Sequence, residues 1–136
     1  MVKPIVKDKF FLSRKSEPAT KADAPIIKDL EDTLNANKVE CVGMAANMIG
    51  EAKDIIIVDL GQENLVMVNP RIISKTGHYQ ISEGCLCFEG EQNVTRYRNI
   101  EVEYEDRNFK PTHGRFDGWV AEVILHEMDH LQGILV

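Results

Sequence analysis

One stretch near the end of the chain decides the fold: Asp117-Gly-Trp-Val-Ala-Glu-Val-Ile-Leu-His-Glu-Met-Asp-His-Leu-Gln-Gly133. Asp117 is a favoured N-cap residue, the interior is rich in helix formers, and Gly133 stands where a C-terminal cap belongs. Residues 120–125 are almost continuously apolar. We therefore predict a helix over this stretch and expect it to lie buried at the centre of the protein, because its apolar side chains need cover.

Four further segments predict elements that surround this helix. Apolar residues recur at helical spacing over residues 25–37, with a proline in the first turn. Residues 54–59 and 64–69 are β-branched runs joined by Gly61-Gln-Glu, which predicts an antiparallel pair. Residues 99–105 alternate between apolar and acidic side chains, which is typical of a half-exposed strand.

The remaining segments predict less regular structure. Residues 1–24 mix Lys, Ser, Pro and Thr, and we expect an extended lead-in on the surface. Residues 41–50 contain small and apolar side chains between glycines, a composition suited to a buried strand or a tight loop. We expect Pro70 to close the strand before it and Gly77 to lie in a turn. Together these elements predict one α+β domain over residues 1–136, with antiparallel strands packed around the central helix.

Composition excludes several classes of protein. The 136 residues are 43% hydrophobic and 28% charged, an ordinary balance for a globular chain. The net charge is −6 and the basic residues are scattered, which argues against direct binding of nucleic acid. No apolar stretch approaches the roughly 20 residues that cross a bilayer, and no signal-peptide core is visible, so we expect a cytoplasmic protein without membrane contact. Three cysteines, an odd number, indicate reduced thiols.

The predicted central helix carries His126-Glu-Met-Asp-His130, and this motif points to a metal ion. Residues four apart on a helix lie one turn above each other, so both imidazoles can reach one ion. Glu127 is rotated about 100° from His126. It can therefore sit beside the metal and move a proton from a water to a leaving group. A solvated helix face would carry similar residues, but the apolar run before the motif favours burial.

Cys85 is the candidate third ligand, since a catalytic metal site needs three protein ligands and one open position. It lies in Ser82-Glu-Gly-Cys-Leu-Cys-Phe-Glu-Gly90, where Gly84 permits close backbone approach and the Leu86 N–H can point into the same space. We expect Cys87 to point to the opposite side. A thiolate and two imidazoles suit a borderline-soft divalent ion, which acidifies a bound water and polarises a carbonyl.

Three short segments, in this order, resemble the motifs of peptide deformylases: Gly43-Met-Ala-Ala46, Glu83-Gly-Cys-Leu86 and His126-Glu-Met-Asp-His130. The similarity also runs through Met67-Val-Asn-Pro70 and covers most of the chain from about residue 23 onward. The resemblance implies a metal-dependent amide hydrolase that removes the N-formyl group from the N-terminal methionine of nascent bacterial-type proteins and releases formate. It implies N-formylmethionyl nascent peptides as partners, together with the ribosome exit region.

By position, the resemblance implies that Cys85, His126 and His130 are the metal ligands. It makes Glu127 the general acid and base, and Leu86 the donor of a backbone N–H to the oxyanion. Iron(II) is the metal that the family implies, and zinc, nickel or cobalt can occupy such sites.

Two interpretations of Arg96 stay open. Its guanidinium could pair with Glu83 or Asp129 behind the metal and so fix the orientation of the ligands. A plain surface salt bridge explains the same residues equally well.

Met48 is the main departure from the family. The first motif of the family continues to a glutamine that donates to the oxyanion, and Met48 stands in its place. A thioether cannot donate a hydrogen bond, and loss of one oxyanion donor costs about 100- to 1,000-fold in turnover. A second hypothesis therefore stays open, namely a homologue that keeps fold and metal but has weak, altered or no activity and acts as a binding or sequestering module. Gly43 and Met44 mark the expected substrate neighbourhood together with Met48, although core packing is the commoner reason for a residue like Met44.

Two more hypotheses have less support from the sequence. A zinc metalloprotease with the same helix motif needs a third ligand downstream, and the six residues after His130 include no His, Asp, Glu or Cys. A purely structural protein without metal is the remaining alternative, which elemental analysis would favour if it showed no first-row metal after anaerobic purification. His78 and His113 lie outside any ligand spacing and are predicted on the surface, and Cys41 is predicted to be a small buried hydrophobe.

Overall fold

One antiparallel sheet and a C-terminal helix make up most of the fold. The computed structural model describes residues 1–85 and 87–136. Its elements, in chain order, are α1 (Lys9–Leu12), η1 (Lys21–Asp23), α2 (Ala24–Ala36), β1 (Gly43–Ala45), η2 (Ala46–Ile49), β2 (Ile55–Asp59), β3 (Asn64–Cys85), β4 (Phe88–Glu105), β5 (Pro111–Asp117) and α3 (Gly118–Leu131). The sheet has the order β1-β2-β3-β4-β5, and each strand is antiparallel to its neighbours. The predicted α+β class with antiparallel strands around a central helix is confirmed.

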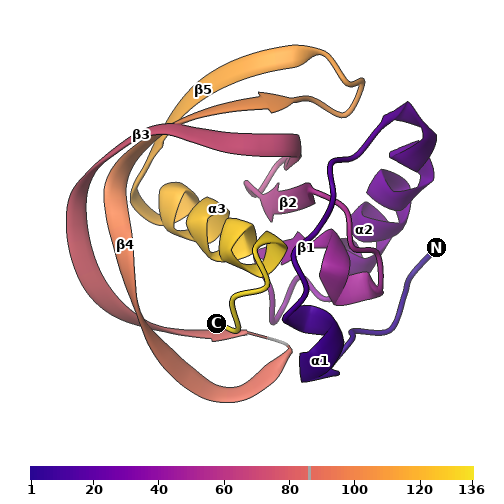
Figure 1. Cartoon of the computed structure of the whole chain (residues 1–136), viewed down its shortest axis with the longest axis horizontal. Coiled ribbons are helices and arrows are strands. Elements are labelled where there is room, and N and C mark those ends of the chain that lie inside the picture. The colour runs from indigo at the N-terminus through magenta and orange to yellow at the C-terminus, as the bar shows by residue number, and fades with distance from the viewer. Residues whose placement is uncertain (86) are drawn as a thin grey trace.

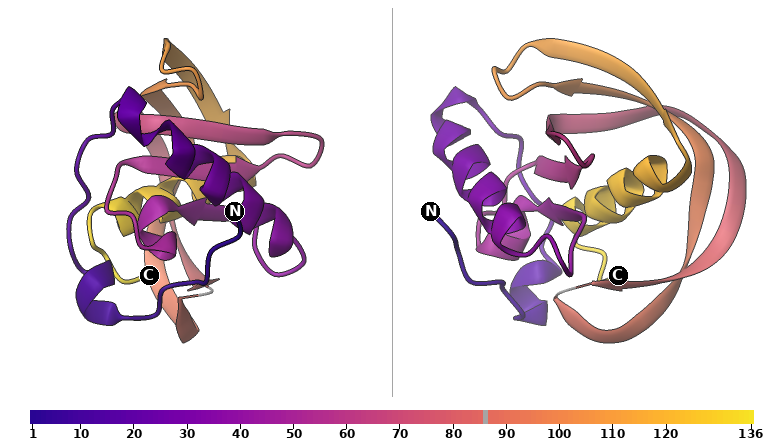
Figure 2. Two further views of the ribbon diagram at one scale, coloured as in Figure 1. Left: turned by 90° about the vertical axis from the view of Figure 1, so that its right-hand side faces the viewer. Right: turned by 180° about the vertical axis from the view of Figure 1, so that it is seen from behind.

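The position of α3 follows from the curvature of the sheet. The long β3–β4 hairpin bends around α3, so the helix lies in the hollow of the sheet (Figure 1). Helix α2 lies beyond β1 and β2 on the side away from α3, as the views in Figure 2 show. Ala121 and Ile124 of α3 are fully buried, and so is Ile57 of β2. The metal motif at the end of α3 is thus carried by an element that the sheet encloses.

Both long helices form where the sequence predicts them. Helix α2 has its proline in the first turn and buries Ile27, Leu30 and Leu34 on one face. Helix α3 begins directly after Asp117 and ends at Leu131. Gly133 adopts a positive φ of 78°, and a Cβ built there would lie 2.3 Å from the carbonyl oxygen of Ser13. This glycine therefore permits a close approach between the end of α3 and the N-terminal segment.

The strand prediction around Pro70 is wrong. Strand β3 does not end there but continues to Cys85, and its pairing with β4 shifts register between Val68 and Arg71. Asn69, with a positive φ of 52°, lies inside this irregularity. Because a bulge frees a residue from the hydrogen-bond ladder, a proline without an N–H can be accommodated at that point. Gly77 likewise lies within β3, although its φ of 74° is unusual for a strand.

Two further elements differ from the predictions. The segment of residues 1–24 contains the short helix α1 in addition to extended backbone. Strand β5 has no counterpart among the predicted elements, and it pairs with β4 from Asn99–Asp117 to Glu105–Pro111. In the described part of the chain, no helix combines the length and apolar character needed to cross a membrane.

Candidate metal centre

Three ligand atoms converge where the end of β3 meets the last turns of α3. The Nε2 atoms of His126 and His130 lie 3.2 Å apart, because the two residues are one helical turn apart and both rings face the sheet. The Sγ atom of Cys85 lies 3.3 Å from Nε2 of His130. All three ligand atoms lie within 4.8 Å of one another.

The spacing of these atoms fits one metal ion. Tetrahedral bonds of about 2.0–2.1 Å to nitrogen and about 2.3 Å to sulfur place neighbouring donor atoms roughly 3.3–3.6 Å apart. Two of the three separations here are 3.2 and 3.3 Å, and the third is no more than 4.8 Å. Two imidazoles and a thiolate are also the donor types that borderline-soft divalent metals prefer. The residues therefore form a three-point donor set of the kind found in catalytic sites, which leave a fourth position for water or substrate.

The ionisation of the two neighbouring thiols is set by their contact. A hydrogen bond from Cys87, followed by those of His126 and His130, lowers the pKa of Cys85 below its ordinary value although burial opposes this. The same contact, together with burial, raises the pKa of Cys87. Cys85 is thus the more acidic of the two thiols. The prediction that Cys87 points away from Cys85 is wrong, because Cys87 lies in the turn between β3 and β4, where strand alternation does not apply.

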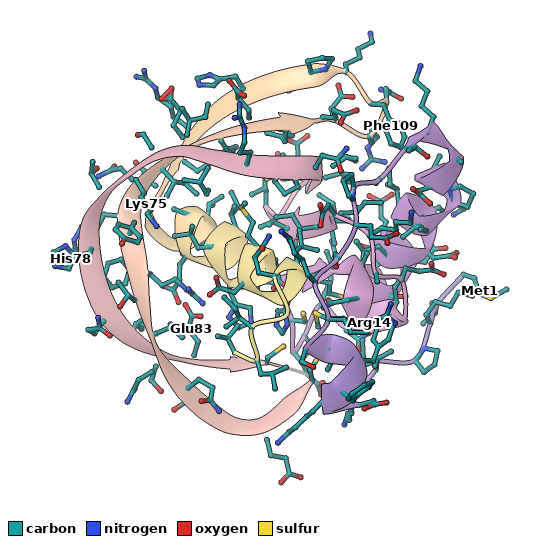
Figure 3. All side chains as sticks on the ribbon, viewed as in Figure 1. Met1, Arg14, Lys75, His78, Glu83 and Phe109 are labelled. Atoms are coloured by element: carbon teal, nitrogen blue, oxygen red, sulfur yellow. The ribbon has the colours of Figure 1, made fainter. Side chains whose placement is uncertain are left out.

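A buried ion-pair network stands behind His126. Glu83, on β3, accepts a hydrogen bond of 2.7 Å from Nδ1 of His126. Arg96, on β4, donates to Glu83 at 2.7 and 3.0 Å and to Asp129 at 2.7 Å. Arg96 is only 3% exposed, so its interactions are not a surface salt bridge. Figure 3 shows Glu83 on the inner side of the hairpin near α3, whereas His78 points outward.

This network fixes the orientation of the His126 ring. Since Nδ1 is held by Glu83, Nε2 is the atom directed toward Cys85 and His130. Burial opposes the protonation of His126, but hydrogen bonds with Cys85 and Glu83 raise its pKa to about 10. Burial likewise opposes the ionisation of Glu83, but hydrogen bonds from His126 and Arg96 lower the pKa of this carboxyl well below its ordinary value. Glu83 is therefore the carboxylate that holds His126.

Glu127 lies beside the three ligand atoms without belonging to their set. Its side chain is 4% exposed, and its Oε1 atom has no hydrogen-bond partner among residues 1–85 and 87–136. Burial raises the pKa of Glu127 to about 7. Gly43 of β1 leaves room for this carboxyl, since a Cβ there would lie 3.1 Å from Oε2 of Glu127 and 2.5 Å from Cγ1 of Val123. A carboxyl with this pKa can both accept and donate a proton near neutrality.

The segment after Gly43 packs into the core. Met44 and Met48 are fully buried, and neither is among the described residues that line the cavity beside the ligand atoms. The sulfur of Met48 accepts a hydrogen bond of 3.4 Å from the Ala45 N–H. Met44 and Met48 are therefore core residues here, while Gly43 lines the cavity.

Asn47 makes a contact with α3 that the sequence did not predict. Its side-chain amide donates a 2.8 Å hydrogen bond to the carbonyl oxygen of His130, and its side chain is 1% exposed. Asn47 thus ties η2 to the turn of α3 that carries His130. Only the tertiary structure brings these segments together, since they lie 83 residues apart.

A cavity of about 510 Å³ opens beside the ligand atoms, a volume within the usual range for small-molecule sites. Its described lining includes Cys85, His126 and Glu127 together with Glu122, Glu40 and Cys41. The thiol of Cys41 donates to the carbonyl oxygen of Gly43, and burial raises its pKa to about 12. Cys41 is thus an unreactive thiol. Leu86, the predicted oxyanion donor, lies outside the described residues, and His78 and His113 are exposed as predicted.

Comparison with known proteins agrees with this geometry. The model of the family described as Polypeptide deformylase matches residues 2–136. A peptide deformylase of Clostridium beijerinckii is 49% identical over 136 residues, which is 100% of both chains. The crystal structure of a peptide deformylase from Legionella pneumophila superposes with a TM-score of 0.89 at 30% identity, covering 99% of this chain and 83% of that one. A peptide deformylase from Synechococcus elongatus in complex with actinonin gives a TM-score of 0.87 at 31% identity, covering 98% and 75%.

The fold and the donor set define a hydrolase that works through a metal ion. The chain belongs to the polypeptide deformylase family. The enzyme class predicted from the sequence motifs, a metallohydrolase that removes the N-formyl group from nascent chains, is confirmed by this membership. None of the comparisons favours the hypothesis of a homologue without activity.

Proposed function

We propose that Cys85, His126 and His130 bind one divalent metal ion and that Glu127 moves the protons of formyl hydrolysis at this site. The observation that carries the proposal is the convergence of three metal-donor atoms and a nearly fully buried carboxyl on one cavity. Such a combination supplies the donors and the proton acceptor that amide hydrolysis by a metal-activated water requires.

The reaction adds water to the formyl carbon and breaks the bond from that carbon to the methionine nitrogen. When bound, the metal lowers the pKa of the water nucleophile and polarises the formyl carbonyl. Glu127 takes the proton from the water as the new C–O bond forms, and it then delivers a proton to the leaving amine. Formate and a peptide with a free amino group are the products. The backbone N–H of Leu86 stabilises the developing oxyanion in this proposal.

Glu83, Arg96 and Asp129 support the site from behind. The Glu83 carboxylate holds His126 in the tautomer with Nε2 available, and Arg96 keeps that carboxylate ionised and in place. Iron(II) is the metal that we propose, with zinc, nickel and cobalt able to bind the same thiolate and imidazoles.

The partners and the location follow from the substrate. N-formylmethionyl nascent peptides exist where proteins are synthesised, so we propose that the enzyme acts in the cytoplasm near the ribosome exit region. The net charge of −6 argues that this proximity does not depend on direct contact with nucleic acid.

A formate assay tests the proposal. The protein is loaded anaerobically with iron(II) and given formyl-Met-Ala-Ser, in wild-type form and as the Glu127→Ala and Met48→Gln variants. We expect formate from the wild type and none above background from Glu127→Ala. Because Met48 packs in the core, we expect the wild type to release formate without the Met48→Gln substitution. Formate release at the same rate from wild type and Glu127→Ala would contradict the role of Glu127.

A further inference from the structure

Two cysteines beside the metal donors have no part in formyl hydrolysis. Cys41 and Cys85 both line the cavity, and only Cys85 is a proposed metal ligand. Cys87, the third cysteine of the chain, lies in the turn between β3 and β4 and is 3% exposed. All three side chains are free thiols in the structure. Cys41 and Cys87 are thus sulfur groups next to the site whose chemistry is unassigned.

The turn brings Cys85 and Cys87 into contact. A hydrogen bond joins the two side chains. The backbone keeps them close, because Cys85 pairs with Phe88 across the hairpin and two residues span at most about 7 Å even when fully extended. A disulfide needs Cα atoms roughly 4.4–6.8 Å apart. A bond between the two sulfur atoms therefore requires only a local adjustment of this turn.

Access and reactivity differ among the three thiols. Cys85 lines the cavity, so a small dissolved reagent that enters the cavity can reach its sulfur, whereas Cys87 is almost fully buried. The Cys41 thiol donates a 2.8 Å hydrogen bond to the carbonyl oxygen of Gly43, and burial raises its pKa to about 12. Cys41 is therefore a poor nucleophile, although it lines the same cavity.

We propose that Cys85 and Cys87 are a site of reversible oxidation, at which a hydroperoxide converts the two thiols to a disulfide. The Cys85 sulfur, as thiolate, attacks one oxygen of hydrogen peroxide, the O–O bond breaks, and the departing hydroxide takes up the thiol proton as water. The Cys87 sulfur then attacks the resulting sulfenic acid, the S–O bond breaks, and a second water leaves. In total the two sulfur atoms lose two electrons, and the peroxide gains them.

The disulfide has two consequences for the site. Because a metal ligand must be a thiolate, the oxidised Cys85 sulfur no longer serves as the third donor beside His126 and His130. Only this consequence rests on the proposed function. Cys87 also protects Cys85, since a small thiol reverses a disulfide by exchange, whereas a sulfenic acid that meets more peroxide becomes an irreversible sulfinic acid.

Mass spectrometry of metal-free protein tests the pairing. After one equivalent of hydrogen peroxide, we expect the loss of two of the three titratable thiols and a mass decrease of about 2 Da. Cleavage after lysine and arginine leaves Cys85 and Cys87 together in residues 76–96, and Cys41 in residues 39–53. The decrease should fall within the first peptide. A cross-link between the two peptides, or no disulfide at all, would overturn the proposal.

Cysteine variants test the protection of Cys85. With about ten equivalents of peroxide followed by dithiothreitol, we expect the wild type to recover at least about 10-fold more Cys85 thiol than Cys87→Ser or Cys87→Ala. Cys41→Ser is the matched control and should recover as the wild type does, because Cys41 lines the same cavity but has no part in the bond. Equal recovery in the wild type and both Cys87 variants would overturn the proposal.

Zinc release separates this inference from the proposed function, since zinc has no redox chemistry of its own. Peroxide should release one zinc ion per chain from the zinc-loaded wild type to a chromophoric chelator, and dithiothreitol should restore zinc binding once the chelator is removed. A Cys85–Cys87 disulfide in protein that binds no zinc would support the oxidation site and contradict the proposed metal centre. Zinc release without a disulfide would leave the metal centre standing and overturn the oxidation site.

Discussion

The two faces of the β3–β4 hairpin carry the same kind of interaction in opposite surroundings. On the inner face, Arg96 pairs with Glu83 and Asp129, and the Arg96 and Glu83 side chains are only 4% and 6% exposed. On the outer face, Arg71 pairs with Glu103, and these side chains are 74% and 49% exposed. Water screens the outer pair, so it contributes little, whereas breaking the inner network leaves uncompensated charges out of water. Burial therefore decides which ion pairs the active site depends on.

The largest effect should come from the group that the inner face positions for chemistry. Glu127→Gln removes the proton acceptor but nearly preserves shape, so we expect kcat to fall about 1,000-fold, within the range for loss of an acid–base catalyst. Metal content measured by elemental analysis should stay at one ion per chain, because Glu127 is not among the three converging ligand atoms. A fall in bound metal parallel to the fall in kcat would show that Glu127 is a ligand instead.

Arg96→Met tests the inner network directly. The substitution leaves the Glu83 carboxylate and its Asp129 neighbour without their buried cation, and we expect a loss of about 3–5 kcal/mol in the free energy of unfolding. Urea denaturation of the metal-loaded protein measures it. A loss below about 1 kcal/mol would mean that the buried Arg96–Glu83 pair contributes no more to stability than the exposed Arg71–Glu103 pair.

Asn47→Ala should weaken the site without touching a ligand atom. Loss of the hydrogen bond to the His130 carbonyl frees the last turn of α3, and we expect metal affinity to drop about 10-fold, the lower end for residues that orient ligands. Competition with a chromophoric chelator measures the affinity. Asn47→Gln is too large for this buried position, whereas Asn47→Leu nearly keeps the size and carries no hydrogen-bond donor, so it should match the alanine variant. Unchanged affinity in both would limit Asn47 to packing.

The stabilisation of the folded protein by the ionised Glu83 carboxylate should be lost in acid. Because hydrogen bonds from His126 and Arg96 hold the folded-state pKa of Glu83 below its ordinary value of 4.5, its stabilisation is complete above that pH and is lost as the pH falls below it. The difference in unfolding free energy between wild type and Glu83→Gln should thus be widest above about pH 5 and narrow toward pH 3. A difference that is constant over this interval would mean that the Glu83 carboxylate is not held ionised by its partners.

The smallest effect is expected on the outer face. Arg71→Met removes a cation whose partner Glu103 is solvated, so the free energy of unfolding should change by less than about 1 kcal/mol. This variant serves as the matched control for Arg96→Met in the same denaturation experiment. A loss as large as that of Arg96→Met would show that the hairpin depends on its arginines irrespective of burial.

The residues of the site differ in how far the sequence alone predicts their positions. Helical spacing places His126 and His130 on one side of α3, which needs only a local pattern. Cys85 reaches them from 45 residues away, and the sequence made it a candidate through its glycine neighbour and the family resemblance. The engagement of Arg96 depends on which face of β4 it occupies, and the sequence by itself leaves its two interpretations equally good. Asn47 enters the site through a contact with a segment 83 residues away, which no local pattern encodes.

Strand assignment fails where local propensity and tertiary pairing disagree. Strand β5 contains proline, glycine and alternating polar residues, and it forms because β4 offers it a partner. A proline such as Pro70 normally ends a strand, but the register shift at this point allows β3 to continue past it. The predicted orientation of Cys87 is wrong because it assumed a continuous strand, whereas Cys87 lies in the turn between β3 and β4.

Formyl hydrolysis should depend on one metal ion held by Cys85, His126 and His130. Metal-free protein is titrated anaerobically with iron(II), and the initial rate of formate release from formyl-Met-Ala-Ser is measured at each step for wild type and Cys85→Ala. In the wild type we expect the rate to rise in proportion to added iron and to level off at one ion per chain, with no rise in Cys85→Ala. Equal rates with and without iron, or full activity in Cys85→Ala, would contradict it.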